Sequence, residues 1–300
     1  MFHVTANNCL AQTATIAGGK LVHMHKWDPA EALRIIEEEK ITVFSGVPTM
    51  SREIINHPDF ARRDTSSLTA MNGGGAAVQP DLIDKIDKGG RGAQPGQGYG
   101  MTETCGLIST SSGYFLTDKP NSAGQVLPIY EVKCLDPDGN ELDPGETGEI
   151  YVRGAQVIKG YLNRPEATAE SIIDGWLRTG DIGFVDEDNF IYLVDRAKDM
   201  VLRGGENVYC SEVEAALYKH PDVAECTVFS VPDERLGEEV GAAVYPREGS
   251  RITAEDIRDF GRTQLAGYKV PRYIWILDQP LPRNASGKFV KRELQDLSLI

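Results

Sequence analysis

Short strand-like runs alternate with helix-length segments over the first hundred residues of this chain. The apolar runs lie at residues 20–24, 41–45 and 67–71, with a further short strand expected before Gly98. The helix-length segments between them begin at Asp28, Thr49 and Pro80. Strands and helices of these lengths in alternation predict βαβ units and a parallel sheet.

The first of these helices has a clear start signal. Asp28 occupies an N-cap position, Pro29 the first helical position and Glu31 the third, which is a pattern typical of helix N-termini. The apolar residues that follow fall on one face of a helix, at Ala32, Leu33, Ile35 and Ile36. The last helix of this region is predicted over residues 80–88.

From about Gly124 the pattern changes to strands joined by tight turns. Residues 130–135 and 148–152 are strand-like and flank turn residues at 137–140, and residues 183–185 and 190–194 flank a turn at 186–189. Such spacing favours antiparallel hairpins. We expect a small β-rich lobe here, built as a barrel.

A third pattern begins near Asp195. A helix is predicted over residues 211–220, where Ser211 and Glu214 are expected to form a capping box. The remaining elements expected are strands at 224–230 and 240–245, a helix opened by Thr253 and a short amphipathic helix at 290–297. Together they predict an α+β unit of about a hundred residues, which is enough for an independent domain.

Composition excludes several classes of protein. At about 150 residues per domain, 300 residues favour two domains. The net charge of −14 disfavours a nucleic-acid partner, because phosphate repels an acidic surface. No apolar stretch approaches the roughly 20 residues of a membrane span. Five scattered cysteines without a C-x-x-C pair favour free thiols, so we expect a cytoplasmic protein.

Three segments carry residues suited to chemistry. In the first, Tyr99 offers a ring to stack on a base, and Thr102 and Glu103 offer a hydroxyl beside a carboxylate. Glycines at 96, 98 and 100 allow a close backbone approach, so the segment suits a nucleotide with a metal-bound phosphate. A glycine-rich turn after a buried strand explains the same residues without a ligand.

The other two segments are also open to two interpretations. Asp181 follows Thr179 and Gly180 and is suited to accept both hydroxyls of a ribose, but an Asx turn gives the same pattern. Lys288 ends a loop with the sequence Pro-Arg-Asn-Ala-Ser-Gly-Lys and is suited to contact an oxyanion or a phosphate. A solvated lysine on a surface loop is the alternative.

Taken together, the segments resemble the adenylate-forming superfamily of acyl-CoA synthetases, firefly luciferases and adenylation domains, and most closely the fatty-acid or aryl-acid CoA ligases. The chain contains, in family order, counterparts of the signature YGxTE, the W-x-x-TGD motif, the hinge with its following glycine turn, and the terminal P-R-x-x-x-GK loop. These lie at residues 99–103, 176–181, 195–208 and 282–288. Weaker matches lie at residues 1–4, 46–49, 73–77, 145–150, 159–161 and 165–168.

The resemblance implies a fold and a domain division. It predicts an α/β protein: the remainder of a large adenylating domain, with α/β and β-barrel parts, followed by a small mobile α+β domain. Residues 1–195 would form the large domain, with an α/β sublobe at 1–116 and a β-rich sublobe at 117–195. Residues 196–300 would form the small C-terminal domain.

The resemblance also implies roles for residues in an ATP-dependent reaction. Thr102 would contact phosphate, Glu103 would hold Mg²⁺, and Lys288 would stabilise the transition state at the α-phosphate of ATP. Asp181 and Arg196 would bind the ribose. Further contacts to the nucleotide or to coenzyme A are expected at Gly74, Gly75, Ala76, Gln97, Gly98, Tyr99, Gly100, Met101, Tyr192, Lys198, Gly204 and Gly205.

The implied reaction joins a carboxylic acid, expected to be a fatty acid, to coenzyme A through an acyl-adenylate. Lys198 would be the hinge that brings Gly204 and Gly205 to the active site for the thiol step. The alternatives are a fatty acyl-AMP ligase that loads a carrier protein and a non-catalytic nucleotide-binding remnant. Met101 disfavours a peptide-synthetase adenylation domain, where proline is usual at this place.

One departure from the family pattern concerns the phosphate loop. Family members carry a Ser/Thr/Gly-rich loop ending in Pro-Lys-Gly upstream of the match to residues 1–3, and none of the 300 residues supplies it. We therefore expect this chain to correspond to the C-terminal part of a ligase and to be catalytically impaired. An uncovered part of the sheet would also favour self-association.

Overall fold

The computed structural model describes residues 3–74, 80–89, 92–283 and 289–295. The chain divides into two compact units. The larger unit comprises residues 1–179 and 183–193, and the smaller unit comprises residues 180–182 and 194–300. The domain boundary predicted from the sequence lies after residue 195. Residues 180–182 group with the smaller unit, in which the backbone N–H of Ala197 donates to the carbonyl of Gly180 (2.9 Å).

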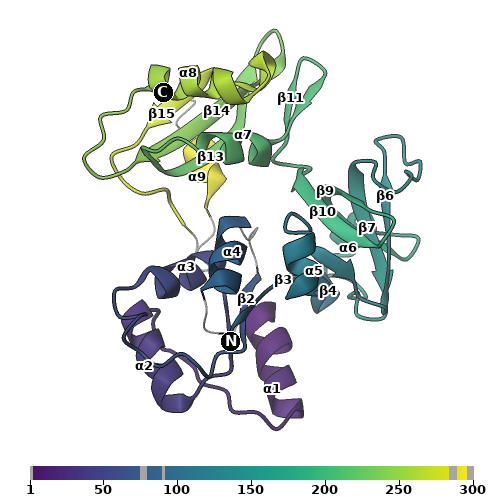
Figure 1. Cartoon of the computed structure of the whole chain (residues 1–300). Coiled ribbons are helices and arrows are strands. Elements are labelled where there is room, and N and C mark those ends of the chain that lie inside the picture. Colours follow the sequence, from purple (N-terminus) through teal and green to yellow (C-terminus); the bar gives the residue numbers. More distant parts are fainter. Residues whose placement is uncertain (1–2, 75–79, 90–91, 284–288, 296–300) are drawn as a thin grey trace. The chain divides into compact units, whose positions relative to one another are not determined.

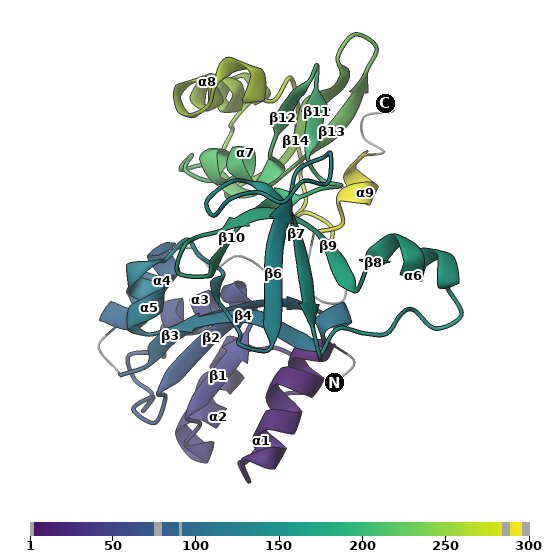
Figure 2. The ribbon, with the colours of Figure 1, turned by 90° about the vertical axis from the view of Figure 1, so that its right-hand side faces the viewer.

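The larger unit is built on a ten-stranded sheet that opens with the predicted parallel strands. Strands β1 (Val43–Gly46), β2 (Ala70–Gly74) and β3 (Gln94–Met101) run parallel, and β4 (Gly106–Ser112) pairs antiparallel with β3. These four strands lie side by side in Figure 2. The mixed α/β fold class expected from the sequence is therefore confirmed.

Three helices pack together against these strands (Figure 1): α2 (Pro29–Glu39), α3 (Pro48–Asn56) and α4 (Pro80–Lys88). The predicted cap of α2 is present, because the Asp28 carboxylate accepts from the backbone N–H of Glu31 (2.9 Å). The shared core contains Leu33, Ile36, Ile54, Leu68, Met71, Leu82 and Ile83. The helical spacing that predicted α2 thus corresponds to a real buried face, and the helix predicted at residues 80–88 is present as α4.

The strand predicted at residues 20–24 is wrong. The chain begins with a π-helix, η1 (Thr5–Gln12), and α1 (Thr13–Ile16), and residues 19–24 form no regular element. Leu21 is 39% exposed, whereas Met24 packs against the helical core. The apolar run therefore anchors a connection to the helices, and no neighbouring strand pairs with it among the described residues.

The β-rich part extends the same sheet. After α5 (Tyr114–Asp118), the order continues from β4 through β5 (Gly124–Val126), β10 (Phe190–Arg196), β9 (Trp176–Val185) and β7 (Gly148–Gly154) to β6 (Tyr130–Leu135). Strands β6 and β7 form the expected hairpin, with Tyr130 opposite Gly154. A short strand β8 (Ile172–Ile173) pairs with β9 and follows α6 (Pro165–Ser171).

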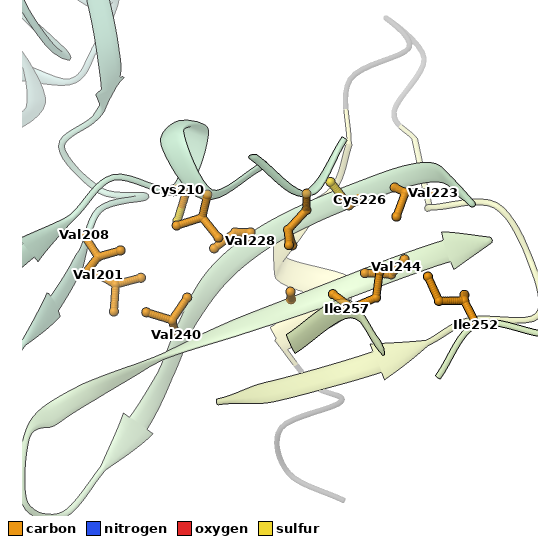
Figure 3. Packing of buried hydrophobic residues seen from close by; sticks show 13 residues of the cluster. Val201, Val208, Cys210, Val223, Cys226, Val228, Val240, Val244, Ile252 and Ile257 are labelled. Carbon is orange, nitrogen blue, oxygen red and sulfur yellow. The ribbon is translucent and has the colours of Figure 1, made fainter. Parts of the chain in front are cut away.

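The smaller unit is a five-stranded sheet with helices. Its strands are β11 (Val201–Arg203), β12 (Glu206–Val208), β13 (Val223–Asp233), β14 (Gly237–Pro246) and β15 (Tyr273–Ile276). Its helices are α7 (Cys210–Leu217), α8 (Ala254–Gln264), the 3₁₀ turn η3 (Gly267–Lys269) and α9 (Lys291–Gln295). Figure 3 shows its core, in which side chains of α7, α8 and the sheet meet, among them Cys210, Val228, Val244 and Ile257.

The capping box predicted at Ser211 is wrong, because both of its side chains form hydrogen bonds with other segments of the chain. The Ser211 hydroxyl donates to the carbonyl of Val194, and the Glu214 carboxylate accepts from the Thr227 hydroxyl (2.9 Å) and the backbone N–H of Val228 (2.8 Å). Both side chains therefore bind other segments and leave the helix end. The helix opened by Thr253 does have such a box, formed with Asp256.

The five cysteines are free, as predicted. Within the described ranges, no helix is long and apolar enough to cross a membrane.

A buried ion pair in the smaller unit governs part of its stability. Glu239 is 1% exposed and accepts two hydrogen bonds from the Arg203 guanidinium, both 2.8 Å long. Burial raises the pKa of Glu239, but the hydrogen bond and charge of Arg203 outweigh burial and hold it below the ordinary value. The carboxylate therefore stabilises the fold at neutral pH.

We expect Glu239→Gln to lower the free energy of unfolding of the smaller unit by about 3 kcal/mol, because it leaves a partly buried guanidinium unpaired. Since the folded pKa is lowered, this contribution is present above the unfolded pKa of about 4.3 and is lost as the pH falls through the folded pKa. Urea unfolding at pH 7 and at several pH values below about 4 measures both effects. Glu234→Gln, at an exposed position, is the matched control; equal losses in the two variants would contradict the assignment.

Candidate active site

The YGxTE segment is a strand followed by a tight turn. Strand β3 continues to Met101, and the 3₁₀ turn η2 (Thr102–Thr104) follows it. Residues 97–101 are therefore not the glycine-rich turn considered from the sequence. The turn is closed by Cys105, whose φ of 53° is left-handed and whose N–H donates to the carbonyl of Thr102 (3.0 Å).

A buried hydroxyl fixes the shape of this turn. Thr104 is fully buried, and its Oγ1 accepts from the backbone N–H of Met101 (3.2 Å). The same oxygen lies 3.0 Å from the Met101 carbonyl and 2.9 Å from the Gly106 carbonyl, either of which can accept its proton. The hydroxyl therefore joins the end of β3 to the start of β4. The exposed Thr102 and the partly buried Glu103 are held on a turn whose backbone has little freedom.

The glycines of the segment are required by packing within the sheet. A Cβ on Gly98 would lie 2.6 Å from a methyl group of Leu107, and one on Gly100 would lie 1.9 Å from the carbonyl oxygen of Gly106. Both distances are shorter than real Cβ contacts. The approach of the β4 backbone thus requires a glycine at 100, and a Cβ at 98 would displace the Leu107 side chain. The ligand approach suggested by the sequence stays a prediction.

The neighbouring residues of the predicted nucleotide site lie on adjacent strands. Gly74, at the end of β2, is the register partner of Gly98, and Gly73 is the partner of Gln97. The Gln97 amide donates to the carbonyl of Ser122. Tyr99 and Met101 pack partly against the core of the β-rich part. Gly75 and Ala76 lie outside the described residues.

Glu103 is held by a segment far along the chain. The Tyr161 hydroxyl donates to Oε1 of Glu103 (2.9 Å), and the backbone N–H of Ile158 donates to its carbonyl (2.8 Å). The Tyr130 hydroxyl donates to the carbonyl of the next residue, Thr104 (2.8 Å). Sequence reasoning did not assign Tyr161 or Tyr130 to the site. Its one signal was the weak family match at residues 159–161.

The donor set at Glu103 suits a magnesium ion shared with phosphate. Mg²⁺ commonly binds one or two carboxylates together with substrate phosphates and water. Oε2 of Glu103 accepts no hydrogen bond from the described part of the chain. No group of three or more His, Cys, Asp or Glu side chains there could hold a metal by itself. A cation at Glu103 would therefore take most of its ligands from outside the protein.

Asp181 and Arg196 form a pair in the smaller unit. Asp181 lies within β9, directly after Gly180 with its φ of +73°, and not in the Asx turn considered as an alternative. Its carboxylate is 9% exposed and lies 3.2 Å from Nε of Arg196, which is 53% exposed. The ion pair brings together the two residues predicted to bind a ribose. In the larger unit, the Tyr192 ring stacks on Phe184, with centroids 4.6 Å apart.

The remaining predicted site residues lie after β10. Lys198 is exposed on the connection to β11. Gly204 and Gly205 have φ angles of 58° and 92° and join β11 to β12, with Arg203 opposite Glu206. A two-residue hairpin of this kind needs positive φ at both positions, so the hairpin itself explains the glycines. Lys288 lies outside the described residues.

Comparison with known proteins shows the family to which this chain belongs. Residues 1–162 match the family model described as AMP-binding enzyme, and residues 212–288 match the AMP-binding enzyme C-terminal domain. A feruloyl-CoA synthase of Amycolatopsis sp. is 42% identical over 98% of this chain and 60% of its own length. A long-chain-fatty-acid–CoA ligase of Bacillus subtilis is 37% identical over 98% of this chain and 52% of its own.

Among solved structures, an o-succinylbenzoate coenzyme A synthetase from Bacillus subtilis superposes with a TM-score of 0.87 at 35% identity. It has been solved with the acyl-adenylate OSB-AMP and with ATP and a magnesium ion, and the match covers 98% of this chain and 59% or 60% of that one. The chain belongs to the AMP-binding, adenylate-forming enzyme family. It spans about 60% of the length of the first curated relatives it matches.

We expect Thr104→Val to destabilise the larger unit by about 1–3 kcal/mol, because the partly buried N–H of Met101 loses its acceptor while the volume is kept. Urea unfolding followed by tryptophan fluorescence measures the change. Thr110→Val removes a hydroxyl from an exposed position of β4 and should change stability by less than about 0.5 kcal/mol. Similar effects in both variants would show that the Thr104 hydroxyl does not hold the turn.

Proposed function

We propose that this protein is an ATP-dependent acid–thiol ligase, which activates a carboxylic acid as an acyl-adenylate and transfers the acyl group to coenzyme A. The observation that carries the proposal is the rigid Thr102–Thr104 turn, which presents a hydroxyl and a carboxylate at the end of β3 in a chain of the AMP-binding family. The relatives named above are CoA ligases, which supports the same class of reaction.

In the first half-reaction, an oxygen of the substrate carboxylate attacks the α-phosphorus of ATP and the bond to pyrophosphate breaks. This step brings anions together, so the protein contributes positioning and charge neutralisation. Thr102 is proposed to contact phosphate and Glu103 to hold Mg²⁺, which when bound would neutralise phosphate oxygens. Lys288 is proposed to contact the reacting carboxylate and the α-phosphate.

The nucleoside would be bound by groups on the strand ends. Tyr99 and the glycines beginning at Gly74 are proposed as walls for the adenine. Asp181 is proposed to accept from the ribose hydroxyls. Its ion pair with Arg196, whose Nε lies 3.2 Å from the carboxylate, holds the buried side chain in place.

In the second half-reaction, the thiol sulfur of coenzyme A attacks the acyl carbon and AMP leaves with the electron pair of the broken C–O bond. Lys198 is proposed as the hinge for this step, since a large conformational change is absorbed by a few connecting residues. The Gly204–Gly205 hairpin is proposed to lie beside the pantetheine arm. Its exposed backbone without Cβ atoms suits that contact.

The acid is proposed to be a fatty acid or an aromatic acid. The relative at 37% identity is named for long-chain fatty acids and the one at 42% for feruloyl-CoA. Calorimetry with a matched pair of sulfamoyl-adenosine mimics, one fatty acyl and one feruloyl, would distinguish the two classes. Incubating the chain with a preformed acyl-adenylate and free coenzyme A tests the second half-reaction. Acyl-CoA formation would exclude a ligase restricted to carrier proteins.

We expect the chain to bind AMP and Asp181→Asn to weaken AMP affinity by about 10- to 100-fold, because hydrogen bonds to a charged acceptor contribute about 1.5–3 kcal/mol. Titration calorimetry measures both affinities. Asp174→Asn makes the same change in charge at an exposed position, where the left-handed φ of 51° tolerates asparagine, and is the control. Failure of the unmodified chain to bind AMP, or equal affinities in the two variants, would contradict the proposal.

A further inference from the structure

The carboxylate of Glu103 is oriented from outside its own turn. The Tyr161 hydroxyl reaches it across 58 residues of sequence and donates to Oε1 at 2.9 Å. Both residues belong to the larger unit. A glutamate on a turn otherwise samples several rotamers, and ordering them on ligand binding has an entropic cost. A hydrogen bond to one oxygen reduces that freedom before any ligand arrives.

Tyr161 is in turn fixed by its own surroundings. Its backbone N–H donates to the Thr168 hydroxyl (2.9 Å), and that hydroxyl donates to the carbonyl of Arg164 (2.9 Å). Gly160 has a φ of +154°, and a Cβ there would lie 2.7 Å from a methyl carbon of Thr168. Gly160, Tyr161 and Thr168 thus form one packed unit at the start of α6. The two weak family matches, at residues 159–161 and 165–168, therefore contact each other and fix the position of Tyr161.

We propose that Tyr161 is a positioning residue for the metal-dependent step: its hydroxyl holds one oxygen of the Glu103 carboxylate and leaves the other available to a divalent cation bound with the phosphates of ATP. The inference rests on the proposed function of Glu103. Groups that orient a metal ligand typically change metal affinity or activity by about 10- to 100-fold when removed.

The Tyr161 hydroxyl can be removed without dismantling the segment. The backbone bond from Ile158 to Glu103 and the bond from the Tyr161 N–H to Thr168 do not involve the phenol. Tyr161→Phe therefore removes the link to Oε1, together with the contact of the hydroxyl to Ser171, and keeps the ring. Tyr151→Phe, on β7, is the matched control, since the Tyr151 hydroxyl makes no hydrogen bond to the described residues.

The experiment measures cation and nucleotide binding separately on the whole chain. Mn²⁺, which like Mg²⁺ favours carboxylate ligands, is titrated by electron paramagnetic resonance in the presence of α,β-methylene-ATP. AMP, which brings no β- or γ-phosphate, is titrated by calorimetry. In Tyr161→Phe we expect Mn²⁺ affinity to fall by about 10- to 100-fold and AMP affinity to change by less than about twofold. Tyr151→Phe should match the unmodified chain in both titrations.

Thr168 supplies a second, independent test. Thr168→Val removes the acceptor of the Tyr161 N–H and should lower Mn²⁺ affinity in the same direction, whereas Thr168→Ser keeps the hydroxyl and should restore it. Unchanged Mn²⁺ affinity in Tyr161→Phe would overturn the proposal, as would an equal fall in Mn²⁺ and AMP affinity. Binding of AMP without Mn²⁺ by the unmodified chain would overturn the role of Tyr161 and leave the nucleotide site standing. Binding of neither would overturn the proposed function itself.

Discussion

The hydroxyl of Thr104 is the interaction on which the candidate site depends. It links the N–H of Met101 to a carbonyl of the same loop, in a buried position where an unpaired amide would be costly. Because the backbone between β3 and β4 is fixed in this way, Thr102 and Glu103 have defined positions before a ligand binds. Binding energy is then not spent on ordering the turn, which is the usual advantage of a preorganised site.

Glycines in this chain show how a functional motif can have a structural cause. Gly100 is needed because the β4 backbone passes too close for a Cβ, and a Cβ on Gly98 would displace the Leu107 side chain. Gly204 and Gly205 are needed because a two-residue hairpin has positive φ at both positions. From the sequence these glycines were assigned to ligand contact. Both roles fit the residue type, and the contacts with Leu107 and the Gly106 carbonyl give Gly98 and Gly100 a structural role whether or not a ligand binds.

The sequence predicted correctly those helices and strands that are determined by neighbouring residues. The Asp28 cap and the spacing of α2 gave the helix, and the turn residues between β6 and β7 gave the hairpin. Prediction failed where a distant partner decides: the run at residues 20–24 has no strand beside it, and Ser211 bonds to Val194 instead of capping α7. In the site, Glu103 was predicted from its motif, but Tyr161 lies 58 residues away and no local period connects them.

Residues of the site differ in whether they can be substituted without disturbing the fold. Substituting Gly98 or Gly100 would disturb β3 and β4 whether or not a nucleotide binds there, so lost activity would not identify a ligand contact. Removing the Tyr161 hydroxyl changes its bond to one carboxylate oxygen and its contact with Ser171, and it leaves β3 and β4 intact. The informative positions are therefore those whose side chains meet Glu103 or Asp181 through polar atoms, because there the fold and the chemistry can be varied separately.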